Sequence, residues 1–145
     1  MRIPEMVQKK VEAMNRRDAA AFAACYAPNA VVVDPFYDEP LRGAAIRKDI
    51  ADWFGAFPDT ECRLTHSVVD GANHAGEWVV TGTHKGPLVG PDGEIPATGR
   101  SVNFRVATFE RTDADGRILE EHRYYDGLAI MSQLGLLAQE HAPAG

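Results

Sequence analysis

The chain has 145 residues and a formal net charge of -6 at pH 7. A chain of this length is enough for one domain that buries about two-thirds of its unfolded surface. Its hydrophobic content of 45% and charged content of 25% are typical of globular proteins. The acidic balance, with a pI near 5.3, argues against electrostatic binding to nucleic acid or to an anionic membrane surface.

The sequence also bears on the cellular compartment. No segment has the apolar length of a membrane span, and the first residues lack the apolar core of a signal peptide. The two cysteines, Cys25 and Cys62, are far apart and form no CxxC pair, which indicates reduced thiols and no disulfide framework. We therefore expect a cytoplasmic protein with neither a nucleic-acid nor a membrane partner.

The first half of the chain predicts three helices and one strand. Apolar residues at helical spacing indicate a helix over residues 5–16, and a second, short helix is expected over Ala19–Tyr26. The β-branched run at residues 30–34 is typical of a strand. The apolar stripe within Ile46–Phe57 predicts a third helix that packs on a sheet.

From residue 60 onward the apolar period changes from that of a helix to that of a strand. The predicted strands are Thr60–Asp70, His74–Gly86, Arg100–Thr112 and Gly116–Asp126. A loop over Pro87–Gly99, a last helix over 127–138 and a flexible tail over 139–145 complete the chain. We expect a single α+β domain over residues 1–138, in which long strands curl around the helices and leave a conical cavity.

The last predicted strand carries the most informative polar pattern. Side chains alternate between faces along a strand, so Glu120, His122, Tyr124 and Asp126 share one face. Two acids, an imidazole and a phenol beside a Leu-rich helix indicate the wall of a pocket. We expect this face to line the cavity, and Arg123 to lie on the opposite one.

Several short motifs accompany this order of elements. The most specific are GTHKG at residues 82–86 and ATGR at residues 97–100, joined by a Tyr-Asp pair at 125–126 and QLGL at 133–136. Together they resemble the SnoaL-like polyketide cyclase group of the NTF2-like fold. The resemblance implies a homodimer with one cofactor-free pocket per subunit. It also implies an intramolecular aldol closure of aromatic polyketide esters, with a strand-borne aspartate that maps onto Asp126.

Asp126 is the leading catalytic candidate under this resemblance. An aldol closure needs a base that removes a proton next to a carbonyl and an acid that protonates the new alkoxide, and one carboxylate can do both in turn. Burial would raise the pKa of Asp126 from about 3.9 toward neutral pH. The alternative is that Asp126 caps the helix that begins at Gly127. His84 is the second catalytic candidate, as a donor to the enolate oxygen, unless it is solvated at its strand end.

A further set of residues is expected to bind the substrate. These residues are His122, Tyr124, Trp78, Tyr26, Asn15 and Trp53. For each of them the alternative is ordinary packing or a helix stop. The sequence contains no HxH, HExxH or His-rich cluster, so no metal site is predicted.

Three functions remain open. The first is a cofactor-independent isomerase or cyclase that acts on a carbonyl-bearing small molecule, with Asp126 as the base. The second is an epoxide hydrolase of the same fold, which requires an arginine between two inward carboxylates; Arg105 and Arg123 are the candidates, and the position of Arg123 opposite Asp126 weakens this function. The third is a non-catalytic ligand-binding or dimerisation module.

Overall fold

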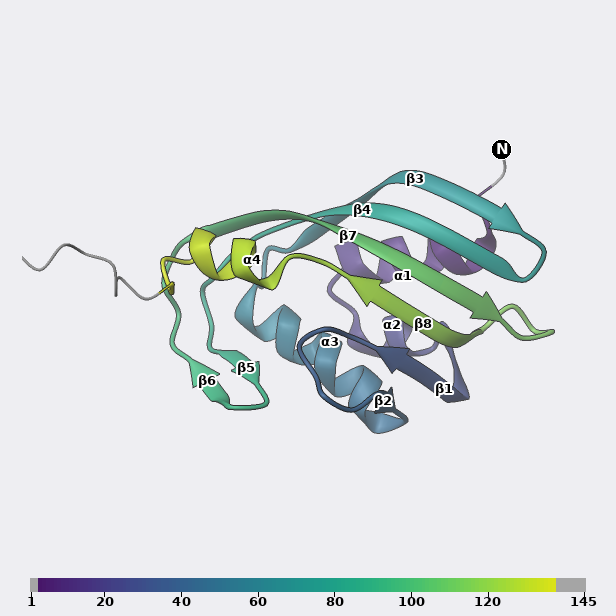
Figure 1. Cartoon of the computed structure of the whole chain (residues 1–145), viewed down its shortest axis with the longest axis horizontal. Coiled ribbons are helices and arrows are strands. Elements are labelled where there is room, and N and C mark those ends of the chain that lie inside the picture. The colour runs from purple at the N-terminus through teal and green to yellow at the C-terminus, as the bar shows by residue number, and fades with distance from the viewer. Residues whose placement is uncertain (1–2, 138–145) are drawn as a thin grey trace, which may run out of the picture.

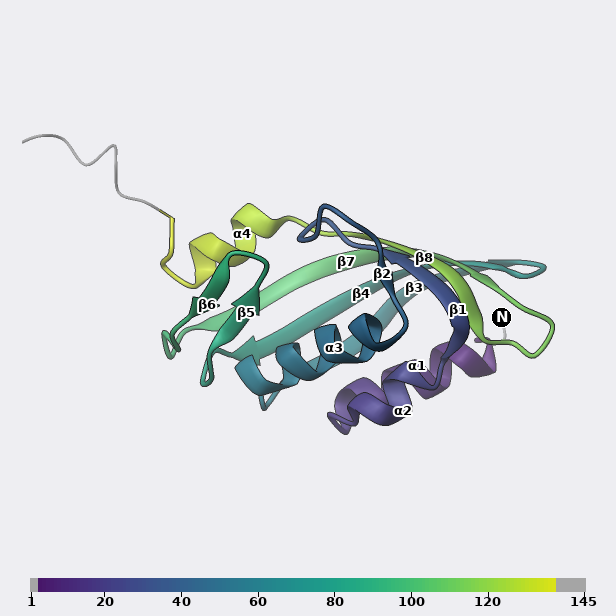
Figure 2. The ribbon, with the colours of Figure 1, turned by 90° about the horizontal axis from the view of Figure 1, so that it is seen from below.

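A curved sheet wraps one face around helices in the computed structural model, which describes residues 3–137 (Figures 1 and 2). The helices are α1 (Glu5–Asn15), α2 (Ala19–Ala23), α3 (Ala44–Ala56) and α4 (Gly127–Gln133). The strands of the six-stranded sheet are β1 (Tyr26–Val33), β2 (Leu41–Arg42), β3 (Glu61–Asp70), β4 (Asn73–Thr83), β7 (Ser101–Thr112) and β8 (Ile118–Tyr124). Their order is β2-β1-β8-β7-β4-β3, with β1 and β8 parallel and the other neighbours antiparallel. The predicted α+β class is confirmed.

The short strand β2 was not expected, β1 begins at Tyr26 before the predicted residue 30, and α4 ends at Gln133. Two further regions differ from the sequence-based expectation in the kind of element. The predicted helix over Ala19–Tyr26 ends at Ala23, because Tyr26 opens β1 and pairs with Ile118 of β8. The predicted loop over Pro87–Gly99 contains a small separate hairpin, β5 (Leu88–Gly90) and β6 (Gly93–Ile95). In both places the pairing of strands overrides the local preference of the sequence.

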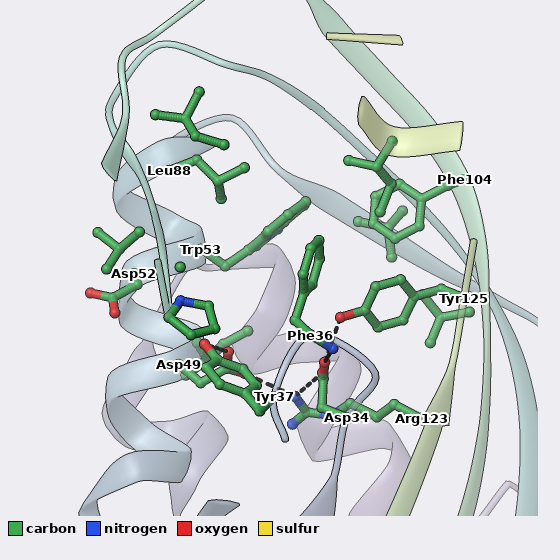
Figure 3. A pocket seen from close by; sticks show the side chains of 18 of the residues that line it. Asp34, Phe36, Tyr37, Asp49, Asp52, Trp53, Leu88, Phe104, Arg123 and Tyr125 are labelled. Atoms are coloured by element: carbon green, nitrogen blue, oxygen red, sulfur yellow. Dashed lines mark hydrogen bonds and ion pairs between the residues drawn. The ribbon is translucent and has the colours of Figure 1, made fainter. Parts of the chain in front are cut away.

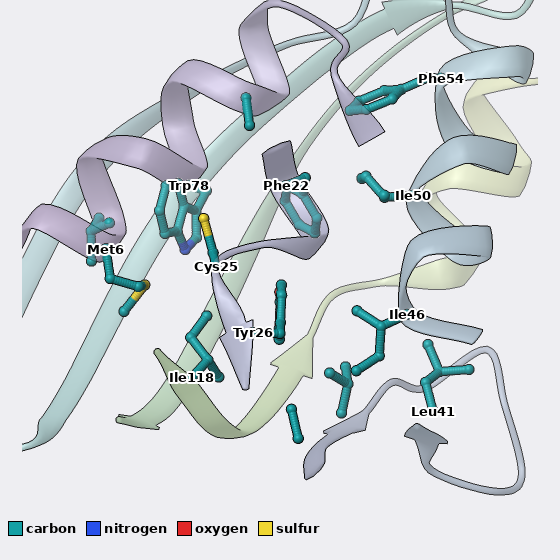
Figure 4. Close-up of a cluster of buried hydrophobic side chains, with 14 residues drawn as sticks. Met6, Phe22, Cys25, Tyr26, Leu41, Ile46, Ile50, Phe54, Trp78 and Ile118 are labelled. Carbon is teal, nitrogen blue, oxygen red and sulfur yellow. The ribbon is translucent and has the colours of Figure 1, made fainter. Parts of the chain in front are cut away.

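One end of the wrapped sheet is packed with apolar side chains, whereas the other end is covered by α4 and the β5–β6 hairpin (Figure 2). At the packed end, Val7 of α1, Val32 of β1 and Ile118 of β8 are 0% exposed. Figure 4 shows how Phe22 and Tyr26 fill the space between the helices and the sheet. This apolar cluster therefore lies beside the end covered by α4 and the hairpin and does not fill it.

The predicted tail, the homodimer and the cellular compartment are not features of a single chain described over residues 3–137. The predicted tail at 139–145 falls outside the described residues. The homodimer and the cytoplasmic compartment stay predictions. No helix within the described residues is both long enough and apolar enough to cross a bilayer.

The junction between β4 and the hairpin packs directly on the end of α3, and this contact is testable. The Gly86 amide donates to the Ala56 carbonyl at 3.1 Å, and a Cβ at Gly86 would lie 2.1 Å from the Gly55 carbonyl oxygen. We expect Gly86→Ala to lower the free energy of unfolding by about 1–3 kcal/mol, because the backbone must move apart. Gly90→Ala is the matched control, since its Cβ would meet only the Gly93 carbonyl oxygen at 3.8 Å. Equal urea midpoints for the two variants would contradict this expectation.

Candidate functional site

A cavity of about 400 Å³ lies between α3, the inner face of the sheet and the β5–β6 hairpin (Figure 3). This volume falls in the usual range for small-molecule sites, about 300–1,000 Å³. Its wall is mainly apolar and includes Phe36, Trp53, Trp78, Leu88, Phe104 and Ile130. The cavity could therefore accept a planar hydrophobic molecule. Within residues 3–137 no group of three or more His, Cys, Asp or Glu side chains could hold a metal ion.

Arg123 of β8 joins two carboxylates on this wall (Figure 3). Its Nη1 donates to Asp49 Oδ2 at 2.8 Å and to Asp34 Oδ2 at 3.2 Å. Asp49 belongs to α3, whereas Asp34 directly follows β1. We call Asp34, Arg123 and Asp49 the Asp–Arg–Asp bridge. One guanidinium thus fixes the distance between two cavity carboxylates that come from different elements.

Each carboxylate of the bridge also accepts a hydrogen bond from a tyrosine. The Tyr125 hydroxyl donates to Asp34 Oδ1 at 2.5 Å, and the Tyr37 hydroxyl donates to Asp49 Oδ1 at 2.9 Å. Burial, together with the adjacent carboxylate, raises the pKa of both phenols above their ordinary value. Both phenols therefore keep their protons at neutral pH and remain hydrogen-bond donors.

The local sequence explains why Asp34 points inward. Ala30 and Val32 of β1 are 1% and 0% exposed, and strand alternation places Asp34 on the same side. Oδ1 of Asp34 also accepts the Phe36 amide at 2.9 Å, which turns the chain after Pro35. Asp34 therefore accepts three hydrogen bonds and is 5% exposed.

A buried group of charged side chains lies behind the bridge. Glu121 Oε1 accepts from Arg123 Nε at 2.6 Å, and Glu121 Oε2 accepts from Lys10 Nζ at 2.6 Å. Lys10 also donates to Glu110 Oε2 at 2.8 Å, and the Tyr26 hydroxyl donates to Glu121 Oε1 at 2.8 Å. Both glutamate side chains are 0% exposed. The site therefore continues from the cavity wall into the protein interior.

The pairing of these groups outweighs the cost of burying them. Burial alone would raise the pKa of Glu121, but Lys10 and Arg123 hold it well below its ordinary value. Burial alone would lower the pKa of Lys10, yet Glu110 and Glu121 raise it above the usual range. Glu121 and Lys10 are therefore both charged at neutral pH, and their attraction fixes α1 against the sheet.

The prediction that the strand face with Glu120, His122, Tyr124 and Asp126 lines the cavity is wrong. Asp126 is exposed, and its Oδ1 accepts the Ala129 amide at 3.0 Å, so it is the N-cap of α4. Tyr124 is 56% exposed and packs against Phe109, while His122 bonds to Glu120 at 2.7 Å. The opposite face, which carries Glu121, Arg123 and Tyr125, points inward because buried partners compensate its charges. The predicted burial of Asp126 is therefore also wrong.

The cavity wall also lacks three other residues that were predicted for the site: His84, Asn15 and Tyr26. His84 is 0% exposed, stacks on Phe57 with ring centroids 5.3 Å apart, and its Nδ1 accepts the Thr98 amide at 3.2 Å. Burial lowers the pKa of His84, so its ring is neutral. Asn15 joins α1 to the backbone of Cys62 at 2.7 and 3.1 Å.

Tyr26 lies behind the cavity, where it bonds to Glu121. Trp53 and Trp78 do line the cavity; their Nε1 atoms donate to the hydroxyls of Thr60 and Thr108 at 3.1 and 2.8 Å. Only their ring surfaces are thus offered to a ligand, and their part in substrate binding stays a prediction.

The sequence analysis did not predict the two aspartates of the bridge, or Tyr125 and Tyr37, as site residues. One signal was present in α1, where Lys10 occupies the buried face together with Met6 and Ala13. A lysine on an apolar face requires buried carboxylates. These were available in the alternating positions 121 and 110 of the predicted strands.

The capping role of Asp126 gives a direct test. Asp126→Ala removes the acceptor for the Ala129 amide, so we expect the free energy of unfolding to fall by about 1 kcal/mol. Asp126→Asn keeps a capping oxygen and should match the native protein in urea unfolding. Turnover should persist in both variants, because the side chain lies outside the cavity. A loss of turnover in a stably folded Asp126→Asn protein would contradict this assignment.

The charge of Glu121 predicts how stability depends on pH. Since its folded pKa lies below its ordinary value of 4.5, the unfolded chain binds the proton more readily. Its contribution is therefore complete above pH 4.5 and is lost as the pH falls toward the folded pKa. Urea unfolding between pH 3 and 7 should show a shallower acid loss in Glu121→Gln than in the native protein. The exposed residue Glu61 is the control, and Glu61→Gln should retain the native slope.

The chain can now be compared with known proteins. The profile of the SnoaL-like polyketide cyclase family matches residues 5–134. No curated protein matches the chain. The structure is similar to IdmH from Streptomyces antibioticus, a candidate polyketide cyclase, with a TM-score of 0.74 and 25% identity over 90% of this chain and 96% of that one.

Two further solved structures have the same fold. A protein from Catenulispora acidiphila with a ketosteroid isomerase-like fold gives a TM-score of 0.77 at 22% identity, over 95% of this chain and 98% of that one. SalBIII, an epoxide hydrolase/cyclase-like enzyme in pyran ring formation in the polyether salinomycin, gives 0.69 at 18% identity, over 86% and 91%. The family profile spans nearly all of the described residues and these neighbours share the architecture. The chain therefore belongs to the SnoaL-like polyketide cyclase family.

Proposed function

We propose that this protein closes a ring in a carbonyl-bearing, polyketide-like substrate by acid–base catalysis, with Asp49 as the base. The observation that carries the proposal is the Asp–Arg–Asp bridge on the wall of a mainly apolar cavity. Membership of the cyclase family supports the same reaction class. The reacting groups are the protein's own side chains.

Asp49 is the better base of the two aspartates. It accepts hydrogen bonds from Arg123 and Tyr37, whereas Asp34 accepts three and is nearly enclosed. Each donor stabilises the ionised carboxylate and weakens it as a base. The Asp49 side chain is 19% exposed and keeps lone pairs that can reach a bound molecule.

The ring closure needs one proton to leave and return. Asp49 removes the proton next to a carbonyl, and the resulting enolate carbon attacks a second carbonyl of the same molecule. A carbon–carbon bond forms, the second carbonyl becomes an alkoxide, and the carboxyl of Asp49 returns the proton to it. The phenols of Tyr37 and Tyr125 donate their single protons to Asp49 and Asp34, so they hold the two carboxylates in place during the reaction.

The same bridge favours a second candidate, the opening of an epoxide. That reaction needs one carboxyl to protonate the epoxide oxygen and another carboxylate to take the proton of the attacking water or hydroxyl. Asp34 and Asp49, joined through Arg123, supply two such groups. The products separate the candidates: epoxide opening by water adds one water to the substrate mass, and opening by an internal hydroxyl forms a new carbon–oxygen bond, whereas an aldol closure forms a new carbon–carbon bond with no change in mass.

The proposal is tested by assaying aromatic polyketide esters for ring closure by liquid chromatography, with the new carbon–carbon bond of the product identified by NMR. We expect Asp49→Asn to lower kcat by about 10²–10⁴-fold, since the amide cannot accept the proton. Asp52→Asn is the matched control. Asp52 lies on the same helix and the same wall but pairs with Lys48 at 2.6 Å instead of with Arg123, so turnover should remain within a few-fold of the native value.

Binding and chemistry are separated by a second measurement. A ligand that binds the folded protein raises its Tm, and this shift should be equal in the native protein and in Asp49→Asn. Native turnover in Asp49→Asn would exclude Asp49 as the base. Equal Tm shifts without turnover of any ester or epoxide in the native protein would instead favour the ligand-binding module.

A further inference from the structure

We propose that Glu121 is a positioning residue, which holds the Arg123 guanidinium across Asp34 and Asp49 with Lys10 as its counter-charge. This inference rests on the proposed function, because it assigns a role in preparing Asp49. Glu121 is 0% exposed and does not line the cavity, so it acts through Arg123 and not on the substrate.

The contacts of Glu121 leave its carboxylate a single arrangement. Oε1 accepts Arg123 Nε at 2.6 Å, and Oε2 accepts Lys10 Nζ at 2.6 Å. The Tyr26 hydroxyl lies 2.8 Å from Oε1 and closes the remaining side. These partners come from α1, β1 and β8, so three separate elements fix the position of one carboxylate.

This arrangement determines which atoms of Arg123 reach the aspartates. An arginine commonly grips one carboxylate through two parallel N–H groups. Here Glu121 occupies Nε, and the single atom Nη1 is shared by Asp34 and Asp49 at 3.2 and 2.8 Å. Without Glu121 the guanidinium can turn and grip one aspartate through two of its nitrogens. Glu121 therefore keeps Arg123 shared between the two carboxylates.

Lys10 offsets part of the negative charge that surrounds Arg123. Arg123 carries one positive charge and faces three carboxylates, those of Glu121, Asp34 and Asp49. Lys10 Nζ lies 2.6 Å from Glu121 and supplies a second positive charge in the same buried volume. Glu121 can thus hold Arg123 in place while much of the Arg123 charge remains available to the aspartates.

A control residue in the same network makes the test specific. Glu110 is also 0% exposed and accepts from Lys10 at 2.8 Å, but its other partners are His74 and Thr108. Glu110→Gln and Glu121→Gln therefore remove the same charge from the same lysine. Only Glu121 contacts Arg123, so only its variant should disturb the bridge.

The first measurement needs no substrate. In protein with ¹³C-labelled aspartate carboxyls, we expect Glu121→Gln to shift the carboxyl resonances of Asp34 and Asp49, because the guanidinium that contacts both can turn. Exchange of the Arg123 Hε proton with water should become at least about tenfold faster, because its charged acceptor is lost. Glu110→Gln should leave both quantities at the native values.

The second measurement is turnover of the substrate that the ester assay identifies. Glu121→Gln should lower kcat about tenfold or more with KM nearly unchanged, since an Asp49 that the shared guanidinium no longer positions leaves substrate binding intact but is misplaced for abstracting the proton. Glu110→Gln should stay within about threefold in both constants. If Glu121→Gln does not fold, Glu121→Asp keeps the charge but withdraws it from Arg123, and the faster Hε exchange is again expected.

Two outcomes would overturn the inference. One is equal behaviour of the Glu110 and Glu121 variants in carboxyl resonances, proton exchange and kcat. The other is a disturbed bridge in Glu121→Gln with native kcat. A failure of the proposed function looks different, because then Asp49→Asn turns over like the native protein whatever the carboxyl resonances show.

Discussion

The pairing of Glu121 with Lys10 and Arg123 is the constraint on which the functional site depends. Each of these charges loses its water on folding, at a cost of several kcal/mol, and only close opposite charges offset that cost. The Lys10–Glu121 contact at 2.6 Å connects α1, near the start of the chain, to β8, near its end. Removing one partner of such a buried set costs about 3–5 kcal/mol, so the set fixes both the fold and the direction in which Arg123 points.

The position of this set explains how one small domain combines a firm core with a hollow. The apolar side chains of α1, α2 and β1 fill the end of the wrapped sheet that is away from α4. The charged groups separate that core from the cavity, and the Asp–Arg–Asp bridge lies on the cavity side (Figure 3). Apolar walls keep the local dielectric constant low, which strengthens interactions between a bound molecule and these few charges.

Much of the architecture was predictable because it depends on the spacing of apolar residues along the chain. Apolar spacing gave α1 and α3, and alternation gave the four long strands, each to within a few residues. The hairpin at Leu88–Ile95 was missed because its strands are only three residues long. Trp53 and Trp78 line the cavity, since large aromatic residues on apolar faces turn inward, and their part in substrate binding stays a prediction. Asp34 ends the predicted strand at residues 30–34 and was not predicted as a site residue, although its alternation with the buried Val32 places it on the inner face.

The sequence by itself determined the α+β class, the family and the presence of a cavity-forming sheet, because these follow from periods and motifs along the chain. Only the tertiary structure decided which face of β8 lines that cavity. Both faces of Glu120–Tyr125 carry polar residues, so a period of two residues cannot distinguish inside from outside. The choice was made by partners distant in sequence: Lys10 lies 111 residues from Glu121, and Asp34 lies 89 residues from Arg123. Buried charges stabilise the face on which they find opposite charges, and that information appears only when distant segments meet.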